Sequence, residues 1–282
     1  MTKTQSKGKK PIIITIIAIC LVALIAWYGC VAYIYLHHSY SGNYRENLET
    51  RYIAHRGLSS EYYQNTESAF FNATQRPFFS GIECDIWLTL DGVWVCCHDN
   101  NPFVNKSIMV TESNYDDIID LPLDTSDATV DVDISKAKLT PFSKYLSVLQ
   151  YSDKSAFIEL KQDYSQESID ELVALVHKKL PIYSTYYCSF NIDIIEKVQK
   201  SDERVNTMMF SGNAITSLFY MRMGYNVGYN KNLLEKKQGR IESHHKENSF
   251  VNVYTINDYD EAQKFAEMGV DYITTDIDFS KE

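Results

Sequence analysis

The chain has 282 residues, of which 27 are basic and 37 are acidic, so its formal net charge is −10 at pH 7. This length allows at most two domains, and 45% hydrophobic with 23% charged residues is ordinary for a globular protein. Eleven glycines and six prolines exclude collagen-like or linker-dominated chains. The acidic balance argues against a nucleic-acid partner, because that affinity depends on Lys and Arg side chains that neutralise phosphates.

The first feature in chain order is a run of 26 residues without charge, residues 11–36. As a helix it would be roughly 39 Å long, which is enough to cross the hydrocarbon core of a membrane. Residues 1–10 contain four lysines and no acid, so the positive-inside rule predicts a cytoplasmic N-terminus. The sequence therefore predicts a single-pass transmembrane helix in the cell membrane, with the rest of the chain extracellular.

Two alternatives to this anchor are a cleaved signal peptide and a buried soluble helix. A signal peptide has an apolar region of about 7–15 residues followed by small residues. Here the run is longer, and Trp27 and Tyr28 precede Cys30, where a lipoprotein signal has small or aliphatic residues. A run of 26 uncharged residues is also excessive for a buried soluble helix.

The expected organisation has four parts, which are a basic cytoplasmic tail over 1–10, the anchor over 11–36, a polar linker over 37–50 and a globular domain over 51–282. In the globular part, strands are expected at 51–55, 81–88, 93–98, 156–161, 183–190, 204–210, 250–256 and 271–275. Helices are expected at 65–75, 145–149, 167–179, 191–200, 214–223 and 258–268. This alternation predicts an α/β fold with a parallel sheet, and the length fits one (β/α)8 TIM barrel.

Two stretches fit the alternation poorly. Residues 100–140 are rich in Ser, Thr and Asp without clear periodicity, and we expect them to form an excursion over the barrel mouth. Residues 225–249 are polar and short for a full strand–helix unit, so we expect a degenerate unit there.

Charged side chains fall near the C-terminal ends of the expected strands, which face the active-site mouth of a barrel. Glu83 and Asp85 are two residues apart and therefore share one face of a strand. Glu159 and Lys161 repeat this arrangement on a later expected strand, 156–161. Charges that point inward are costly unless something compensates them.

One explanation for these charges is a buried ion network in which the three carboxylates pair with Lys161 and Arg56. A divalent metal is the better explanation, because three carboxylates and two cations converge beside two histidines. Hard oxygen ligands of this kind suit Mg²⁺ or Ca²⁺ better than zinc.

Two of the seven histidines differ from the rest. His55 and His98 each end an expected strand near the acidic residues. The other five are interpreted as ordinary core or surface residues, and they are His37, His38, His177, His244 and His245.

The order and spacing of these residues resemble those of the glycerophosphodiester phosphodiesterase family, over about residues 51–278. The matching motifs are His55-Arg56-Gly57, Asn65-Thr66, Glu83-x-Asp85, Asp91-Gly92, His98-Asp99, Glu159-x-Lys161, Tyr254-Thr255-Ile256-Asn257 and Gly269-Val270-Asp271-x-Ile273-x-Thr275-Asp276. The resemblance implies a TIM barrel that cleaves glycerophosphodiesters to glycerol 3-phosphate and an alcohol. It also implies a divalent metal, Mg²⁺ or Ca²⁺, held by Glu83, Asp85 and Glu159.

The resemblance further implies that His55 and His98 form an acid–base pair and that Arg56 and Lys161 contact the phosphate. Phosphodiester cleavage needs this set, since charge must be neutralised, an attacking oxygen deprotonated and a leaving oxygen protonated. Departures from the family pattern are Tyr63-Gln64 in place of Pro-Glu, Tyr254 in place of Trp, and Asp278 in place of Pro. These departures concern the choice of substrate more than catalysis.

Trp87 and Trp94 are candidates to line the leaving-group pocket, with packing at the barrel mouth as an equal alternative. The function expected is metal-dependent hydrolysis of a small-molecule glycerophosphodiester by an enzyme attached to the membrane through its N-terminal helix. Alternatives are phospholipase-type or lysophospholipase D-type cleavage of lipid head groups or glycerophosphate polymers, and a noncatalytic barrel that binds glycerophosphodiesters. No motif points to a protein partner.

Overall fold

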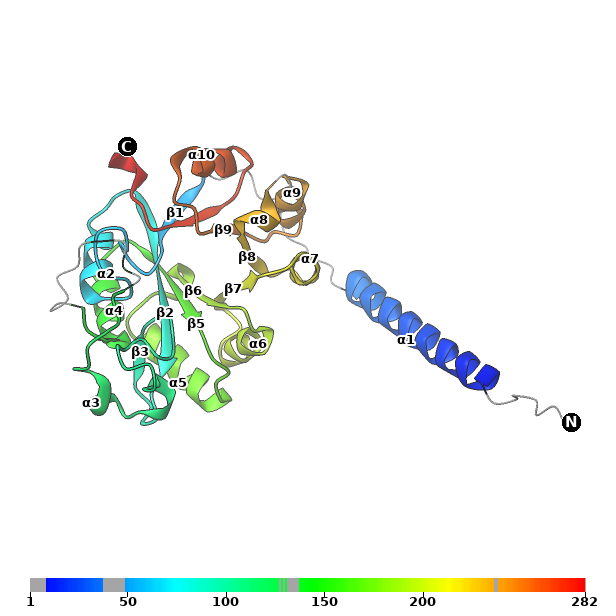
Figure 1. Ribbon diagram of the computed structural model, residues 1–282. Coiled ribbons are helices and arrows are strands. Elements are labelled where there is room, and N and C mark those ends of the chain that lie inside the picture. Colours follow the sequence, from blue (N-terminus) through cyan, green and yellow to red (C-terminus); the bar gives the residue numbers. More distant parts are fainter. Residues whose placement is uncertain are drawn as a thin grey trace, which may run out of the picture. The chain divides into compact units, whose positions relative to one another are not determined.

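Figure 1 shows the computed structural model of the chain, which describes residues 9–37, 49–126, 128, 130, 137–235 and 238–281. The chain divides into two units, Met1–Gly42 and Asn43–Glu282.

The first unit consists of helix α1 (Lys9–His37). The side chains of residues 14–28 are exposed. Within the described residues, no helix combines the length and the apolarity that a membrane crossing requires. The predicted transmembrane helix over 11–36 is therefore not confirmed. The predicted tail over 1–10 and linker over 37–50 lie largely outside the described residues.

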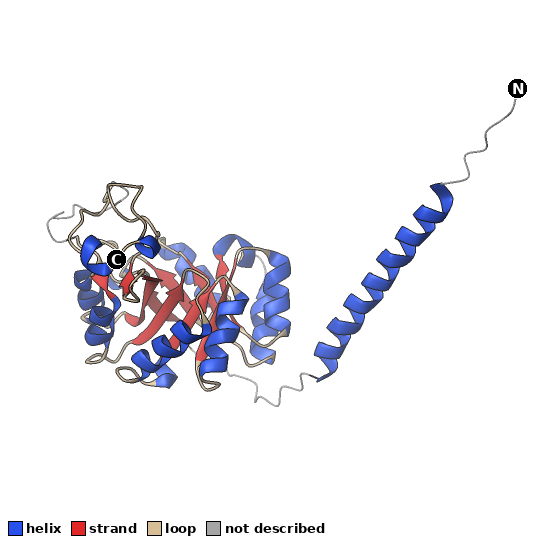
Figure 2. Cartoon of the chain, turned by 90° about the horizontal axis from the view of Figure 1, so that it is seen from below, coloured by secondary structure: helices blue, strands red, loops and turns tan. Residues whose placement is uncertain are grey.

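The second unit contains a closed barrel of parallel strands with helices around it (Figure 2). Each barrel strand pairs in parallel with the next, and β1 pairs with both β10 and β2, which closes the ring. Within the described residues the barrel strands are β1 (Arg51–Ala54), β2 (Phe79–Leu88), β5 (Ser155–Leu160), β6 (Thr185–Ser189), β7 (Asn206–Ser211), β8 (Asn226–Asn230), β9 (Val251–Tyr254) and β10 (Tyr272–Thr275). The predicted (β/α)8 barrel is confirmed.

The helices begin where the sequence supplies N-caps. Five N-cap side chains each accept a hydrogen bond from a backbone N–H in the first turn of the helix that follows. They belong to Thr66, Ser165, Asn191, Asn213 and Asp258. The helices of this unit are α2 (Glu67–Thr74), α3 (Tyr115–Ile118), α4 (Phe142–Leu149), α5 (Gln166–His177), α6 (Ile192–Ser201), α7 (Ala214–Arg222), α8 (Lys231–Leu234), α9 (Gln238–Lys246) and α10 (Tyr259–Glu267). Short 3₁₀ turns lie at Val110–Glu112, Ile182–Ser184 and Phe279–Lys281.

The core lies on both faces of the barrel strands. Two large apolar clusters fill the space between the strands and the helices. A third cluster, which includes Phe157, Tyr186, Phe210 and Tyr272, fills the barrel interior. The interior rings fit because β8 supplies Gly228, where a Cβ atom would lie 2.4 Å from the Phe210 ring.

The expectation that 93–98 is a barrel strand is wrong. This segment is β3 (Trp94–Cys96), which pairs antiparallel with β2 and with the short strand β4 (Thr140–Pro141). A period-two pattern identifies a strand but not the direction of its partner, which explains the error. The excursion expected over 100–140 leaves the barrel after β3 and packs around its own apolar cluster, which includes Phe103, Val110, Ile118 and Leu123.

The expectation of a degenerate unit over 225–249 is also wrong, because this segment holds the complete strand β8 with α8 and α9. The strand is hard to predict from the sequence because β8 begins with a polar residue, Asn226, and not with an apolar one. Asn226 donates to the Thr207 carbonyl at 2.9 Å and accepts from the Phe250 N–H at 2.7 Å. The buried Val227 and Tyr229 then pack against the outer apolar layer.

Candidate active site

Three carboxylates meet at the C-terminal ends of two neighbouring strands. Glu83 and Asp85 lie on β2, and Glu159 lies on β5, where it is in register with Asp85. One oxygen of each carboxylate lies within 4.8 Å of the others, and all three side chains are buried. The sequence predicts this group because side chains two residues apart on a strand share one face.

Two cations and an amide contact this acidic cluster. Lys161 Nζ lies 2.9 Å from Glu159 Oε1 and 3.3 Å from Asp85 Oδ1. Arg56 Nε lies 3.1 Å from Asp85 Oδ2, and the backbone N–H of Arg56 donates to Glu83 Oε2 at 2.8 Å. The side chain of Asn65 donates to Asp85 Oδ2 at 2.8 Å.

The loop after β1 adopts an uncommon backbone to deliver these groups. Arg56 and Asn65 both have a φ of 57°, in the left-handed region that non-glycine residues seldom adopt. Gly57 follows with a φ of 81°, and a Cβ atom there would lie 2.6 Å from the backbone of Ala69. The glycine is therefore required, and the left-handed Arg56 points its N–H at Glu83.

The surroundings divide the protonation of the three carboxylates. Burial, followed by the charges of Asp85 and Glu159, raises the pKa of Glu83 well above its usual value. Burial and the charge of Asp85 raise the pKa of Glu159 to about 7. Burial would also raise the pKa of Asp85, but Arg56 and Lys161 outweigh it and lower that pKa. Burial first, and then the neighbouring negative charges, thus hold the pKa of two of the three acids above its usual value.

The cluster fits a divalent cation. Glu83 Oε1 is buried and accepts no hydrogen bond from any residue that the structure describes. When all three carboxylates are ionised they face two side-chain cations, so one negative charge would be left for a bound cation to compensate. The donors are all hard oxygens, the ligands that Mg²⁺ and Ca²⁺ prefer. The cluster can therefore hold such an ion, as the sequence predicts.

His55 is held by a carboxylate from the other end of the chain. Its Nδ1 lies 2.8 Å from Oδ1 of Asp276, which follows β10. Asp276 also accepts hydrogen bonds from Ser59 Oγ at 2.7 Å and from the Asn257 amide. Burial alone would raise the pKa of Asp276, but the His55 hydrogen bond and charge outweigh it and bring that pKa to about 2.

His98 is held in a similar way. Its Nδ1 lies 2.9 Å from Asp99 Oδ1, and its carbonyl oxygen accepts a hydrogen bond from the Trp87 indole at 3.2 Å. Burial and then the charge of Arg56 lower the pKa of His98 below its usual value. In the described part of the chain, neither His98 nor His55 makes a hydrogen bond through Nε2. Both rings thus offer this nitrogen for proton exchange.

Two polar hollows lie beside these histidines and share Tyr63 and Gln64. The hollow at His98 is lined by residues of the excursion that include Lys106, Asp124 and Ser126. The hollow at His55 is lined by Arg56, Ser59, Tyr62, Ala128, Val130 and Asp276. The excursion therefore borders both hollows at the barrel mouth.

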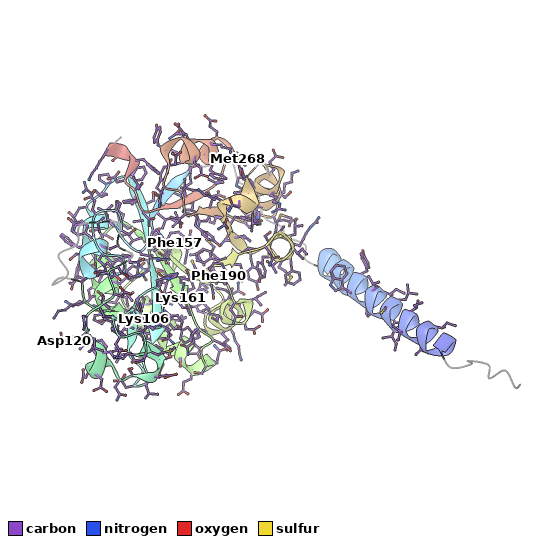
Figure 3. All side chains as sticks on the ribbon, in the orientation of Figure 1. Lys106, Asp120, Phe157, Lys161, Phe190 and Met268 are labelled. Atoms are coloured by element: carbon purple, nitrogen blue, oxygen red, sulfur yellow. The ribbon has the colours of Figure 1, made fainter. Side chains whose placement is uncertain are left out.

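The strands on the other side of the mouth end in aromatic residues. Phe190 follows β6, Phe210 lies on β7 and Tyr254 ends β9, and we call these three residues the aromatic wall. Ring centroids lie 5.3 Å apart for Phe190 and Phe210, and 5.1 Å apart for Phe210 and Tyr254. Figure 3 labels Lys161 and Phe190, which follow the adjacent strand ends of β5 and β6.

The structure thus brings the seven predicted site residues to one end of the barrel. Sequence reasoning gave no role to Asp276, Ser59, Asn257 or Asn65, although three of these four lie in the quoted motifs. Trp94 does not line the pocket, because it is buried against Tyr164 in the outer layer, at 4.8 Å between ring centroids. The alternative of packing holds for this residue.

An eight-stranded barrel whose mouth holds buried carboxylates, cations and two carboxylate-bound histidines has the equipment of a phosphoric diester hydrolase. Residues 55–277 match the model of the glycerophosphoryl diester phosphodiesterase family, and the chain belongs to this family. It is therefore an enzyme that hydrolyses phosphoric diesters. Among curated proteins, the comparison finds no match to this sequence.

Solved structures support the fold. A glycerophosphodiester phosphodiesterase from Parabacteroides distasonis aligns with a TM-score of 0.67 at 24% identity, covering 82% of this chain and 94% of that chain. One from Agrobacterium tumefaciens has the same TM-score and identity, with coverages of 80% and 96%. An Oleispira antarctica phosphodiesterase, solved with its product sn-glycerol 3-phosphate, aligns at 0.69 with 17% identity, covering 80% and 92%.

Proposed function

We propose that the protein hydrolyses glycerophosphodiesters to glycerol 3-phosphate and an alcohol, with Mg²⁺ or Ca²⁺ held by Glu83, Asp85 and Glu159. The observation that carries this proposal is the buried carboxylate cluster, whose oxygens lie within 4.8 Å of one another. The Oleispira antarctica relative, which was solved with sn-glycerol 3-phosphate, supports the choice of product.

The residues around the cluster have distinct roles in this proposal. An ion held by Glu83, Asp85 and Glu159 would supply positive charge at the phosphate and would lower the pKa of the attacking hydroxyl or water. Arg56 and Lys161 contact the phosphate oxygens and stabilise the negative charge that develops on them. Asp85 holds both cations in place before substrate binds, so they need no reorganisation during the reaction.

The two histidines move the protons. Asp276 and Asp99 each bind Nδ1 of one ring, which fixes the tautomer with a proton on Nδ1 and leaves Nε2 to react. One ring takes the proton of the attacking oxygen, and the other donates a proton to the leaving alcohol.

Release of glycerol 3-phosphate by the purified full chain tests this proposal. The chain is given glycerophosphoethanolamine, glycerophosphocholine and glycerophosphoglycerol with Mg²⁺, with Ca²⁺ and with a chelator. We expect release with one of the two ions and none with the chelator. If no diester is cleaved with either ion, the proposal is wrong.

We also propose that residues 11–36 anchor the chain in the cell membrane, with a cytoplasmic N-terminus and an extracellular catalytic domain. The support is in the sequence alone, in the run of 26 uncharged residues and the four lysines before it. The full chain should stay in the membrane pellet after an alkaline carbonate wash, and protease added to intact cells should remove the barrel. Extraction of the chain by the wash would contradict the anchor.

A further inference from the structure

We propose that the aromatic wall of Phe190, Phe210 and Tyr254 binds the alcohol part of the substrate and that this alcohol is an extended alkyl chain. The inference rests on the proposed function and names its substrate class.

The position of the wall places it against the reacting groups. Glu159 on β5 is in register with Cys188 on β6, so Lys161 and Phe190, each two residues further along, follow adjacent strand ends. Both residues are labelled in Figure 3. A phosphate held by Lys161 would therefore have Phe190 beside it.

The rings form a continuous apolar surface that leads outward. Phe210 is 8% exposed and belongs to the interior cluster, whereas Phe190 packs on it and is 51% exposed. The ring of Tyr254 packs against both other rings, with its centroid 6.2 Å from that of Phe190 and 5.1 Å from that of Phe210. The wall thus extends from the barrel interior to solvent. An alkyl chain that leaves the barrel mouth could lie along this surface.

Polarity decides which part of the diester lies on this wall. The hydroxyls of the glycerol part need hydrogen-bond partners, and a hydroxyl desolvated against aromatic rings has none. The hollows at His55 and His98 offer such partners, including Gln64, Ser59 and Asp124. The glycerol part therefore suits the polar side, which leaves the wall to the alcohol.

A quaternary ammonium is the other ligand that aromatic rings bind. Beyond Phe210, helix α7 exposes Ile215, Leu218 and Phe219. These exposed apolar side chains lie on the helix that follows β7 in the chain, which favours a hydrocarbon over a cation at the wall.

The test compares esters that share sn-glycerol 3-phosphate and differ in the alcohol. The full chain is assayed with ethyl, octyl, choline and 3,3-dimethylbutyl esters below micelle-forming concentrations, and kcat/KM is measured from glycerol 3-phosphate release. The 3,3-dimethylbutyl ester has the shape of the choline ester without its charge. We expect the octyl ester to exceed the ethyl ester at least about tenfold, and the neutral isostere to equal or exceed choline.

Phe190→Ala should bring the octyl-to-ethyl ratio to within about threefold of one, because the chain loses its apolar contact. Phe71→Ala is the matched control, since Phe71 is 53% exposed but lies on α2, outside the wall, and the ratio should stay at the wild-type value. A ratio within one variant is independent of how much of that variant is folded.

Three results would overturn the inference while the proposed function stands: a wild-type octyl-to-ethyl ratio near one, a ratio that Phe190→Ala leaves unchanged, or a preference for choline over its isostere. Failure to cleave any of the four esters with either ion would overturn the proposed function and this inference with it.

Discussion

The two halves of the barrel mouth are built from the same kind of strand, parallel and in one sheet, but carry opposite kinds of side chain. The half formed by β1, β2 and β5 carries carboxylates, two cations and a histidine, whereas the half formed by β6, β7 and β9 carries the aromatic wall. Both halves use inward positions at the strand ends, so the backbone does not distinguish them. A barrel can therefore separate reacting groups from a recognition surface by placing them at the ends of different strands.

The largest expected effect comes from the charged half. Glu83→Gln should lower kcat/KM by about 10²–10³ or more. The reason is that the ion would lose the carboxylate ligand whose Oε1 accepts no hydrogen bond from the described residues. The same change removes a buried acid whose pKa is raised, so the folded protein should not be destabilised. Added Mg²⁺ or Ca²⁺ should raise the Tm of the wild type and have a smaller effect on the variant. A variant with full activity would contradict the assignment of Glu83 as a ligand.

The next effect concerns proton transfer. His55→Ala should reduce metal-dependent turnover by about 10²–10⁴, the range for loss of a general acid or base. The metal-induced rise in Tm should persist, because His55 lies outside the carboxylate cluster. His177→Ala serves as a control, since His177 lies on α5 away from the mouth. Full turnover in His55→Ala would rule out the acid–base scheme.

A smaller effect is expected where a residue acts through His55. Asp276→Asn should lower kcat by about 10–100-fold, as for other carboxylates that orient a functional histidine, with KM little changed. The pKa of Asp276 is about 2 when folded, below its usual value, so the ionised carboxylate stabilises the fold above pH 4. That stability, about 2 kcal/mol, is lost as the pH falls from 4 to 2. Urea unfolding across this range should show it in the wild type and not in the variant.

The smallest effect is expected for the pH dependence of stability and concerns a buried histidine of α9. His244 on α9 is buried between Tyr229 and Ser249, at 2.8 and 2.7 Å, and burial, followed by His245, lowers its pKa to about 3. The unfolded chain binds a proton near pH 6.5 and the folded chain does not, so stability should fall by about 1.4 kcal/mol per pH unit below 6.5.

His244→Gln should remove this slope in urea unfolding between pH 7 and 5, and turnover at pH 7 should change little. An unchanged slope in the variant would show that another group titrates over this range.

The charged half could be predicted from the sequence and the aromatic half could not. Glu83, Asp85 and Glu159 stand out because a charge at an inward position needs an explanation, whereas Phe190 and Phe210 look like ordinary core residues in the sequence. The strand β8 was missed because its asparagines bind neighbouring backbone, and β3 was misplaced because periodicity carries no information on partners. Asp276 acquired its role only through His55, 221 positions away.

The contact between His55 and Asp276 joins the end of β1 to the end of β10, the two strands whose pairing closes the barrel. His55 follows β1 and Asp276 follows β10. The two side chains meet because β1 and β10 pair in parallel and close the barrel. A product cut short before residue 276 would carry every proposed metal ligand and both imidazoles, yet one imidazole would lack its support. The chemistry at His55 thus depends on a carboxylate that β10 positions where the barrel closes.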